Sequence, residues 1–386
     1  MVTVYDILQL DVMRSATILA GENGLNRLVG RVGFSDIPLE STSHSPFLTE
    51  GDLLIRSFYP TIKTTDHEQE IVDTISLYIS SNCAACIIFQ QFLPVFPQRA
   101  LALANAHNFP VIALNEVISY ALLIQKISNK ILLSQQRQYQ ESLVLRLIYE
   151  SVPSNEAATL YRQLTNSYSE HFMVLCLTSQ GAAFPDVRSH QALQNYVGAT
   201  IVHCSHSEFM FLPCKDTGPD APYLKRLDYL LSSLGEGCHA GVSHICTPET
   251  IANGLRQSLH ANCIAKTLEK PLFHYDNASP FVLLLSLIDS EKHKEVEEFC
   301  KEVLAPLRQY EQEEKLDLIQ TVTTYINCDG NTGQVSKQLY LHENTVRSRI
   351  NKAKSLLGFR DNHYAFIQRV SLALEAERLM ENLPHL

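Results

Sequence analysis

The sequence predicts a multidomain α/β protein that ends in an all-helical domain. Short apolar runs alternate with segments of helical periodicity through most of the chain, whereas only helical periodicity is found in residues 311–386. Buried strands separated by helices are typical of parallel sheets with helical crossovers. A chain of 386 residues is long enough for several domains, each with its own core.

Composition indicates a globular protein without a membrane partner. The hydrophobic fraction is 45% and the charged fraction 19%. No apolar run is long enough to span a bilayer, and residues 1–16 lack the features of a signal peptide, so we expect a cytoplasmic protein. The ten cysteines lie mostly in apolar runs and are expected to be reduced core residues rather than a disulfide framework.

Residues 1–116 are predicted to form an α/β domain. The carboxyl edge of a parallel sheet is where ligands of such folds usually bind, and Arg56, Ser57, Phe58 and Tyr59 follow an apolar strand there. They are our candidates for binding a small-molecule effector; the alternative, a loop that only turns the chain, stays open. The predicted helices are 3–8, 65–81 and 97–107, and the predicted strands are 16–20, 28–36, 52–56, 84–89 and 110–114.

Residues 117–154 are predicted to contain a long connecting or dimerisation helix. Apolar residues recur at helical spacing near both ends of 117–149, whereas 134–141 is polar all round. Such a helix cannot bury itself against one domain along its whole length. We interpret it as a connector that pairs with its twin in a dimer; a surface helix capping the first domain is the alternative.

Residues 155–310 are predicted to form a second α/β domain followed by a linker helix. A hairpin is expected to turn at 205–207, and the linker helix at 289–307 is expected to end near Pro306. The predicted strands are 172–177, 199–204, 208–212, 237–242 and 272–275, and the predicted helices are 191–197, 224–234 and 249–267.

The last domain, 311–386, contains a predicted helix-turn-helix. After a helix at 315–325, two helices within 331–358 are separated by a break at 340–342, and a final helix is expected at 364–380. Asn331 can cap the first of the two, His342 or Asn344 can cap the second, and Gly358 can end it.

The second helix of this motif has the pattern of a recognition helix. Val346, Ile350, Ala353 and Leu357 form an apolar face, and the opposite face carries amide, hydroxyl and cationic groups that suit base edges and phosphates. Residues 331–360 hold six Lys or Arg and one Glu, a net charge of +5 on a chain of net charge −10. A plain amphipathic hairpin with a basic face remains the alternative. The candidate DNA-binding residues are Lys337, Asn344, Thr345, Arg347, Ser348, Arg349 and Lys352.

Other motifs give little support for an enzyme, a metal or a cofactor. Cys83 and Cys86 have the spacing of a redox pair, but Cys86 opens a buried strand. His203 and Cys204 fall on opposite faces of a strand, so they cannot bind one metal ion together. The chain contains neither a Gly-x-Ser-x-Gly elbow nor a phosphate-binding loop with a Gly-Lys pair. We expect no catalytic residue, no metal and no cofactor.

Residues 342–350 (HENTVRSRI) and 356–358 (LLG) resemble the H-x-N-T-V-x-x-R-L … L-G signature of PucR/CdaR-type bacterial transcriptional regulators. The PucR N-terminal domain is resembled, in order and spacing, by residues 3–8, 20–29, 50–54 and 109–112. The order of predicted strands and helices in the middle of the chain is similar to that of a degenerate GGDEF-like domain. The family usually has an aromatic residue where Ser348 stands. At 205–209 both glycines and the metal-binding Asp of an active cyclase are missing, which argues against cyclase activity.

This resemblance implies a sequence-specific regulator of a catabolic or metabolic operon. Its partners would be a double-stranded DNA operator and a small metabolite of unknown identity, and the protein would be a homodimer or tetramer. The alternative is a cytoplasmic metabolite- or nucleotide-binding signalling protein whose C-terminal hairpin binds another protein.

Overall fold

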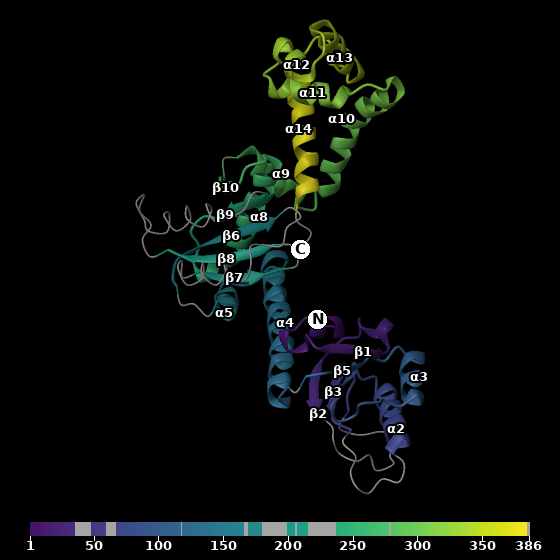
Figure 1. The fold of residues 1–386 in the computed structure, drawn as a ribbon. Helices are drawn as coiled ribbons and strands as arrows, with labels where there is room; N and C mark the ends of the chain where they lie inside the picture. The colour runs from purple at the N-terminus through teal and green to yellow at the C-terminus, as the bar shows by residue number, and fades with distance from the viewer. Residues whose placement is uncertain are drawn as a thin grey trace. The chain divides into compact units, whose positions relative to one another are not determined.

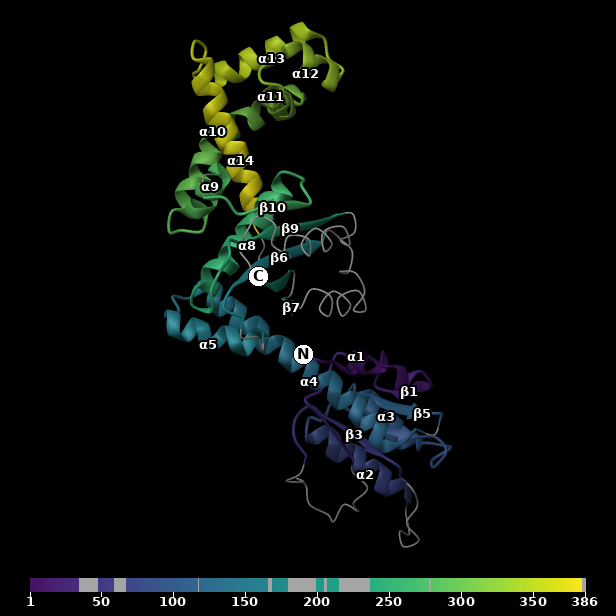
Figure 2. The same cartoon turned by 90° about the vertical axis from the view of Figure 1, so that its left-hand side faces the viewer.

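The computed structural model contains two compact units, Met1–Tyr139 and Gln140–Leu386, which are described separately here (Figures 1 and 2). The structure describes residues 1–34, 48–58, 67–116, 118–165, 169–179, 199–204, 207–214, 237–277 and 279–383.

A five-stranded sheet in the order β1-β5-β4-β3-β2 forms the centre of the first unit. The neighbours from β2 to β5 are parallel, as predicted, but β1 runs antiparallel to β5. The buried strands separated by helices are therefore parallel as predicted, and the edge strand β1 is the exception. Only a 3₁₀ turn, not a crossover helix, follows β1 along the chain, and an antiparallel edge strand on a parallel sheet is common. The strands are β1 Ala16–Ala20, β2 Arg31–Phe34, β3 Asp52–Arg56, β4 Ala85–Phe89 and β5 Val111–Leu114.

Helices cover both faces of this sheet because its central strands are apolar on both sides. Leu53 and Ile55 of β3 pack with α1 and the first half of α4, whereas Leu54 packs with α2 and α3 on the other face. The helices are α1 Val4–Leu8, α2 His67–Ser80, α3 Gln98–Ala106 and α4 Tyr120–Tyr149, with 3₁₀ turns at Asp11–Met13 and Glu22–Gly24.

The second unit contains a five-stranded sheet in the order β10-β9-β6-β8-β7. β6 is antiparallel to β8 and β9, β7 is antiparallel to β8, and β10 is parallel to β9. The predicted hairpin is thus present as β7 and β8. The strands are β6 Phe172–Ser179, β7 Thr200–His203, β8 Glu208–Pro213, β9 Cys238–Val242 and β10 Leu272–His274.

One face of this sheet packs against the second half of α4 together with α5 (Ser154–Thr165) and α8 (Ile251–Thr267), which follows a 3₁₀ turn at Pro248–Thr250. Gly241 of β9 permits the close approach of α8, because a Cβ there would lie 2.0 Å from the Asn262 nitrogen. Asn262 in turn donates to the Cys176 carbonyl oxygen at 3.0 Å. The predicted helices at 191–197 and 224–234, and residues 205 and 206 of the predicted turn, lie outside the described residues.

The C-terminal helices form the rest of the second unit. α10 and α14 lie side by side, and α11, α12 and α13 pack at one end of this pair (Figures 1 and 2). Their core contains residues of all five helices, including Leu304, Val322, Val346 and Phe366. The helices are α9 Pro280–Ile288, α10 His293–Glu314, α11 Leu318–Asn327, α12 Thr332–Leu339, α13 Glu343–Leu356 and α14 His363–Asn382.

The linker helix does not end near Pro306, contrary to the prediction. Pro306 lies inside α10, which continues to Glu314. A proline inside a helix costs about 3 kcal/mol because it removes one backbone hydrogen bond and crowds the preceding turn. Val303, Leu304 and Leu307 are fully buried around Pro306, and their burial offsets this cost.

Eight of the ten cysteines are buried, and Cys204 and Cys238 are partly buried. All ten are free. Burial raises the pKa of the Cys83 thiol to about 12, which makes a reactive thiolate at this position unfavourable. Within the described ranges, no group of three or more His, Cys, Asp or Glu side chains is placed to hold a metal ion. Over those ranges, too, no helix combines the length and the apolar character needed to cross a membrane.

Candidate nucleic-acid interface

The predicted helix-turn-helix is formed by α12 and α13, and side chains cap both helices. Asn331 Oδ1 accepts hydrogen bonds from the Gly333 and Gln334 N–H groups at 3.0 and 3.1 Å. His342 is the cap of α13, since its Nδ1 atom accepts from the Asn344 N–H at 3.2 Å. This acceptor role places the imidazole proton on Nε2.

The turn and the end of the motif depend on left-handed residues. Tyr340 ends α12 with a φ of 53°, and its N–H bonds to the Ser336 carbonyl. Gly358 follows α13 with a φ of 76°, as the sequence predicted. Tyr340 is 95% exposed and stands in the turn before α13. Tyr340 is not among the candidate DNA-binding residues predicted from the sequence, although an exposed aromatic residue in this turn can be recognised there.

Helix α13 has the two faces that its sequence predicted. Val346, Ile350 and Ala353 are buried against the rest of the helical core. Leu357 is only partly buried and caps the helix end. The exposed residues of α13 include six that lie on or beside its outer face: Asn344, Thr345, Arg347, Ser348, Asn351 and Lys352.

Glu343 ties the two helices together and partly neutralises this face. Its Oε1 atom accepts from Thr332 Oγ1 at 2.8 Å and from Arg347 Nη2 at 2.6 Å. The hydrogen bond from Thr332, followed by the contact with Arg347, lowers the pKa of Glu343. The carboxylate therefore stays ionised, and Arg347 is held along its own helix.

Arg349 is directed back into its own domain rather than outward. Its Nη1 atom donates to Thr321 Oγ1 at 3.0 Å and lies 3.4 Å from the Asp317 carbonyl oxygen, both on the α11 side. Of the two arginines predicted to contact a guanine edge or a phosphate, Arg347 is therefore the exposed one and Arg349 joins α13 to α11.

Lys352 and Lys337 both lie at the surface. The Lys352 ammonium stands 4.6 Å from the centre of the Tyr310 ring of α10, a cation–π distance. This contact restrains an exposed cation of α13, and the sequence pattern had not indicated Tyr310 as its partner. Lys337 is exposed near the end of α12.

The predicted effector residues belong to the first unit, and those that the structure describes are buried. Arg56, Ser57 and Phe58 are at most 8% exposed. The Arg56 guanidinium pairs with Glu70 at 3.3 Å and stacks 5.0 Å from the centre of the Phe58 ring. Arg56 therefore stabilises the packing of the first unit. Tyr59 lies outside the described residues.

An open cleft lies at the other end of the strands, the amino edge of the sheet in the first unit. Its volume is about 560 Å³. One wall contains Arg27, Glu50 and Asn82, with Asn82 accepting from Arg27 at 3.1 Å and donating to Glu50 at 2.6 Å. The opposite wall is α4, which supplies Ile131, Ser134, Gln135 and Gln138.

Comparison with known families identifies both ends of the chain. Residues 6–131 match the Purine catabolism regulatory protein-like family, and residues 318–376 match the PucR C-terminal helix-turn-helix domain. The two ends of the chain thus match models of the two ends of PucR-type regulators. The PucR C-terminal match extends from the start of α11 into α14, and so includes the whole of α12 and α13. These matches indicate a PucR-type regulator with a C-terminal helix-turn-helix domain.

One curated protein and one solved structure are similar to parts of this chain. The Purine catabolism regulatory protein of Bacillus subtilis (strain 168) is 28% identical over 147 residues, which are 36% of this chain and 26% of that protein. The chain thus matches about a quarter of that relative's length. The structure titled Regulator of Polyketide Synthase Expression from Bifidobacterium adolescentis aligns with a TM-score of 0.27 at 16% identity, covering 62% of this chain and 98% of that one.

Proposed function

We propose that this PucR-type protein binds double-stranded DNA in a sequence-specific way and regulates a catabolic or metabolic operon in response to a small molecule. The observation that carries the proposal is the outer face of α13. It exposes amide and hydroxyl groups between two cations, while the inner face fixes the helix to its domain. Such a helix suits the major groove, where side-chain amides pair with base edges and cations with phosphates.

The DNA proposal is tested by recovering the genomic fragments that the purified full-length protein retains, and then measuring affinity for the best fragment. Lys352→Ala should weaken binding to all sequences alike and reduce the salt dependence by roughly one phosphate contact. Lys301→Ala is the matched control, because Lys301 is an exposed cation on α10 that pairs with Glu297 away from α13. Equal losses in both variants would contradict a DNA-facing α13.

The competing function, a hairpin that binds protein, makes a different prediction for salt. DNA binding that neutralises several phosphates loses affinity steeply as salt rises, whereas a protein interface with an apolar core depends on salt much less. Retention of no DNA fragment at low salt, together with capture of a protein partner, would favour this alternative.

We place the small-molecule effector in the amino-edge cleft of the first unit rather than beside Arg56. A cleft of about 560 Å³ has the size of small-molecule sites, and polar groups converge on it from both walls. Arg27, Asn82 and Glu50 bond to one another in a row. Their charges compensate locally, which favours an uncharged ligand with hydrogen-bond donors and acceptors.

The position of the cleft gives a route from effector to regulator. α4 lines the cleft through Ser134, Gln135 and Gln138, and the same helix places Val144 and Leu147 in the core of the second unit. A ligand in the cleft would thus contact α4, a helix that runs on past the end of the first unit at Tyr139. A ligand that shifts α4 or makes it more ordered would thereby move Val144 and Leu147 in the core of the second unit.

The effector site is tested with a reporter gene controlled by the retained promoter. Ser134→Tyr fills the cleft from α4 and should abolish the inducer response while leaving DNA affinity unchanged. Gln136→Tyr is the matched control, since Gln136 lies on the same exposed stretch of α4 outside the cleft. A normal response in Ser134→Tyr would exclude this cleft.

A further inference from the structure

An apolar groove lies between α9, α10 and α14 in the second unit. Its volume is about 290 Å³. Leu284 and Leu287 of α9, Val296 and Phe299 of α10, and Leu372 and Ala376 of α14 line it, and its charged lining residues are Lys292 and Glu295. The groove is therefore apolar inside, with one cation and one anion at the α10 end.

Exposed leucines lie along the groove, two of them in its lining (Leu287 and Leu372) and one beyond it (Leu283). Leu283 is 66% exposed, Leu287 36% and Leu372 40%. Leu283 and Leu287 are four residues apart on α9 and so lie on the same side of that helix. α9 thus presents a projecting apolar ridge beside a hollow, a combination in which one copy of the surface can fill another.

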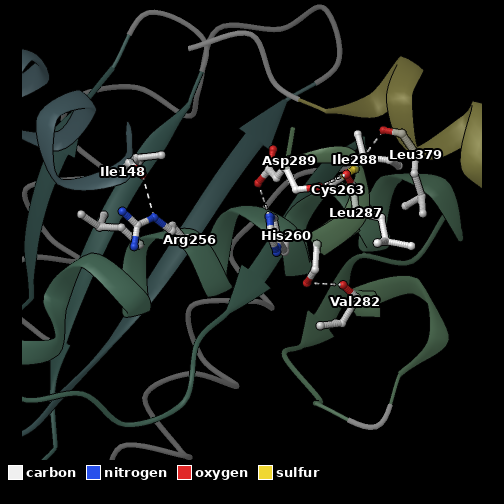
Figure 3. Close-up of polar contacts among 12 residues, drawn as sticks. Ile148, Arg256, His260, Cys263, Val282, Leu287, Ile288, Asp289 and Leu379 are labelled. Atoms are coloured by element: carbon white, nitrogen blue, oxygen red, sulfur yellow. Dashed lines mark hydrogen bonds and ion pairs between the residues drawn. The ribbon is translucent and has the colours of Figure 1, made fainter. Parts of the chain in front are cut away.

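The helix that carries this ridge is firmly held. Asp289, which caps α9, accepts from His260 Nε2 of α8 at 2.5 Å, and Cys263 Sγ of α8 donates to the Leu379 carbonyl oxygen of α14 at 3.3 Å (Figure 3). The His293 ring bonds to the Ile288 carbonyl oxygen at 3.1 Å. The groove is thus preformed, which lowers the entropic cost of binding a partner.

Charge decides which partner fits. A two-fold interface brings the same surface of two copies together. If one residue of the first copy contacts a second residue of the other copy, the reciprocal contact also forms. Lys292 and Glu295 are one helical turn apart at the rim, and a two-fold axis passing between them sets each Lys292 against the partner copy's Glu295. The surface is self-complementary in charge as well as in shape.

We propose that this groove is a symmetric interface with a second copy of the same chain, with the α9 ridge of each copy in the groove of the other. The contact would also set the spacing of the two DNA-binding domains. α10 carries Lys292 and Glu295 near its start and places Leu304 and Leu307 in the helix-turn-helix core. A rigid helix therefore joins the interface to the recognition element. The inference requires no DNA and stands independently of the proposed function.

Charge reversal in the full-length protein tests the symmetric contact. Lys292→Glu and Glu295→Lys each create two like-charged pairs in a two-fold interface and should weaken self-association by roughly tenfold or more, measured by sedimentation equilibrium without DNA. The double variant K292E/E295K restores both opposite-charge pairs and should return the dimer to near wild-type affinity. Lys294→Glu and Glu298→Lys are matched controls, because both residues are exposed on α10 outside the groove lining.

Each result bears on the proposal. Loss in the single variants with recovery in the double variant supports a second copy in the groove. Unchanged association in Lys292→Glu, a monomeric wild-type protein, or loss without recovery in the double variant overturns it, and the last result points to a different occupant. Thermal unfolding of each variant shows that the fold is retained, and Leu283→Asp gives a second, apolar test of the ridge.

Discussion

Thr332 Oγ1 donates a 2.8 Å hydrogen bond to Glu343 Oε1, and this contact joins the first residue of α12 to the first residue of α13. The same oxygen accepts from Arg347. One carboxylate therefore links the starts of the two helices and also restrains a cation on the surface that we propose for DNA.

Glu343→Gln is expected to strengthen DNA binding. The amide oxygen can still accept from Thr332, but the negative charge is gone and Arg347 is released toward phosphate. Affinity should rise for all sequences alike, and the salt dependence should steepen by roughly one contact. Glu343→Ala removes the negative charge and also the acceptor for Thr332. It should bind DNA as tightly as Glu343→Gln only if the hydrogen bond from Thr332 contributes little to DNA binding. Unchanged affinity of the Gln variant in a salt titration would place Glu343 away from the DNA, and weaker binding would show that the carboxylate itself supports the contact.

Thr332→Val should raise the pKa of Glu343 toward its ordinary value. The hydrogen bond from Thr332 is the largest cause of the lowered pKa, and the contact with Arg347 maintains the remainder. A depressed carboxyl pKa contributes stability that is present above the ordinary value and is lost as pH falls through the folded value. The variant should therefore show less acid-dependent loss of stability in this domain. NMR titration of the Glu343 carboxyl carbon measures the shift, and an unchanged pKa would argue against the Thr332 contact in solution.

Asn344→Ala should remove selectivity at one base position. Asn344 is exposed at the N-terminal end of α13, where residues of recognition helices reach base edges. A loss of about 1–3 kcal/mol is expected for the preferred base pair, with little change for other sequences. Ser355→Ala, near the other end of the helix, is the control. Footprinting titrations on single-base variants of the operator decide the matter, and retained selectivity would exclude base contact by Asn344.

Arg349→Ala should lower stability and leave base selectivity intact. The side chain donates to Thr321 Oγ1 of α11, and loss of one such bond costs about 1 kcal/mol. Arg347→Ala is the matched comparison, since this exposed arginine should affect DNA affinity with little effect on the melting temperature. Melting curves and binding isotherms of both variants test the assignment. A base-selective loss in Arg349→Ala would show that its side chain turns outward on DNA.

Local sequence patterns predicted the elements whose signal is contained in a few adjacent residues. β3 was predicted with its observed bounds, and the caps Asn331 and His342 lie where their residue types indicate helix starts. The apolar face through Val346 and Ile350 is likewise a property of spacing within one helix.

Features that depend on distant contacts were missed. The direction of β1 is set by its pairing with β5, nearly one hundred residues away, and no local pattern records it. The sequence of α9 is nearly all apolar, so it lacks the polar face that makes a surface helix recognisable. Arg349 has the residue type and helical position of a DNA contact, and only the placement of α11 turns it inward. Burial of Arg56 is equally invisible from the residues that follow β3.

The last prediction concerns where the DNA-binding domain must begin. Val303, Leu304 and Leu307 of α10 are at most 1% exposed within the helix-turn-helix core, upstream of the predicted boundary at 311. Each contributes about 1.5–3 kcal/mol through burial, and a small domain has only about 5–15 kcal/mol of stability in total. A fragment of residues 311–386 should therefore be largely unfolded at 25 °C, whereas one of 293–386, which keeps the whole of α10, should fold cooperatively. Circular dichroism during thermal unfolding compares the two. A stable, cooperative 311–386 fragment would show that helices α11 to α14 form a sufficient core without α10. Weak DNA binding by such a folded fragment would then result from the loss of assembly, not from unfolding.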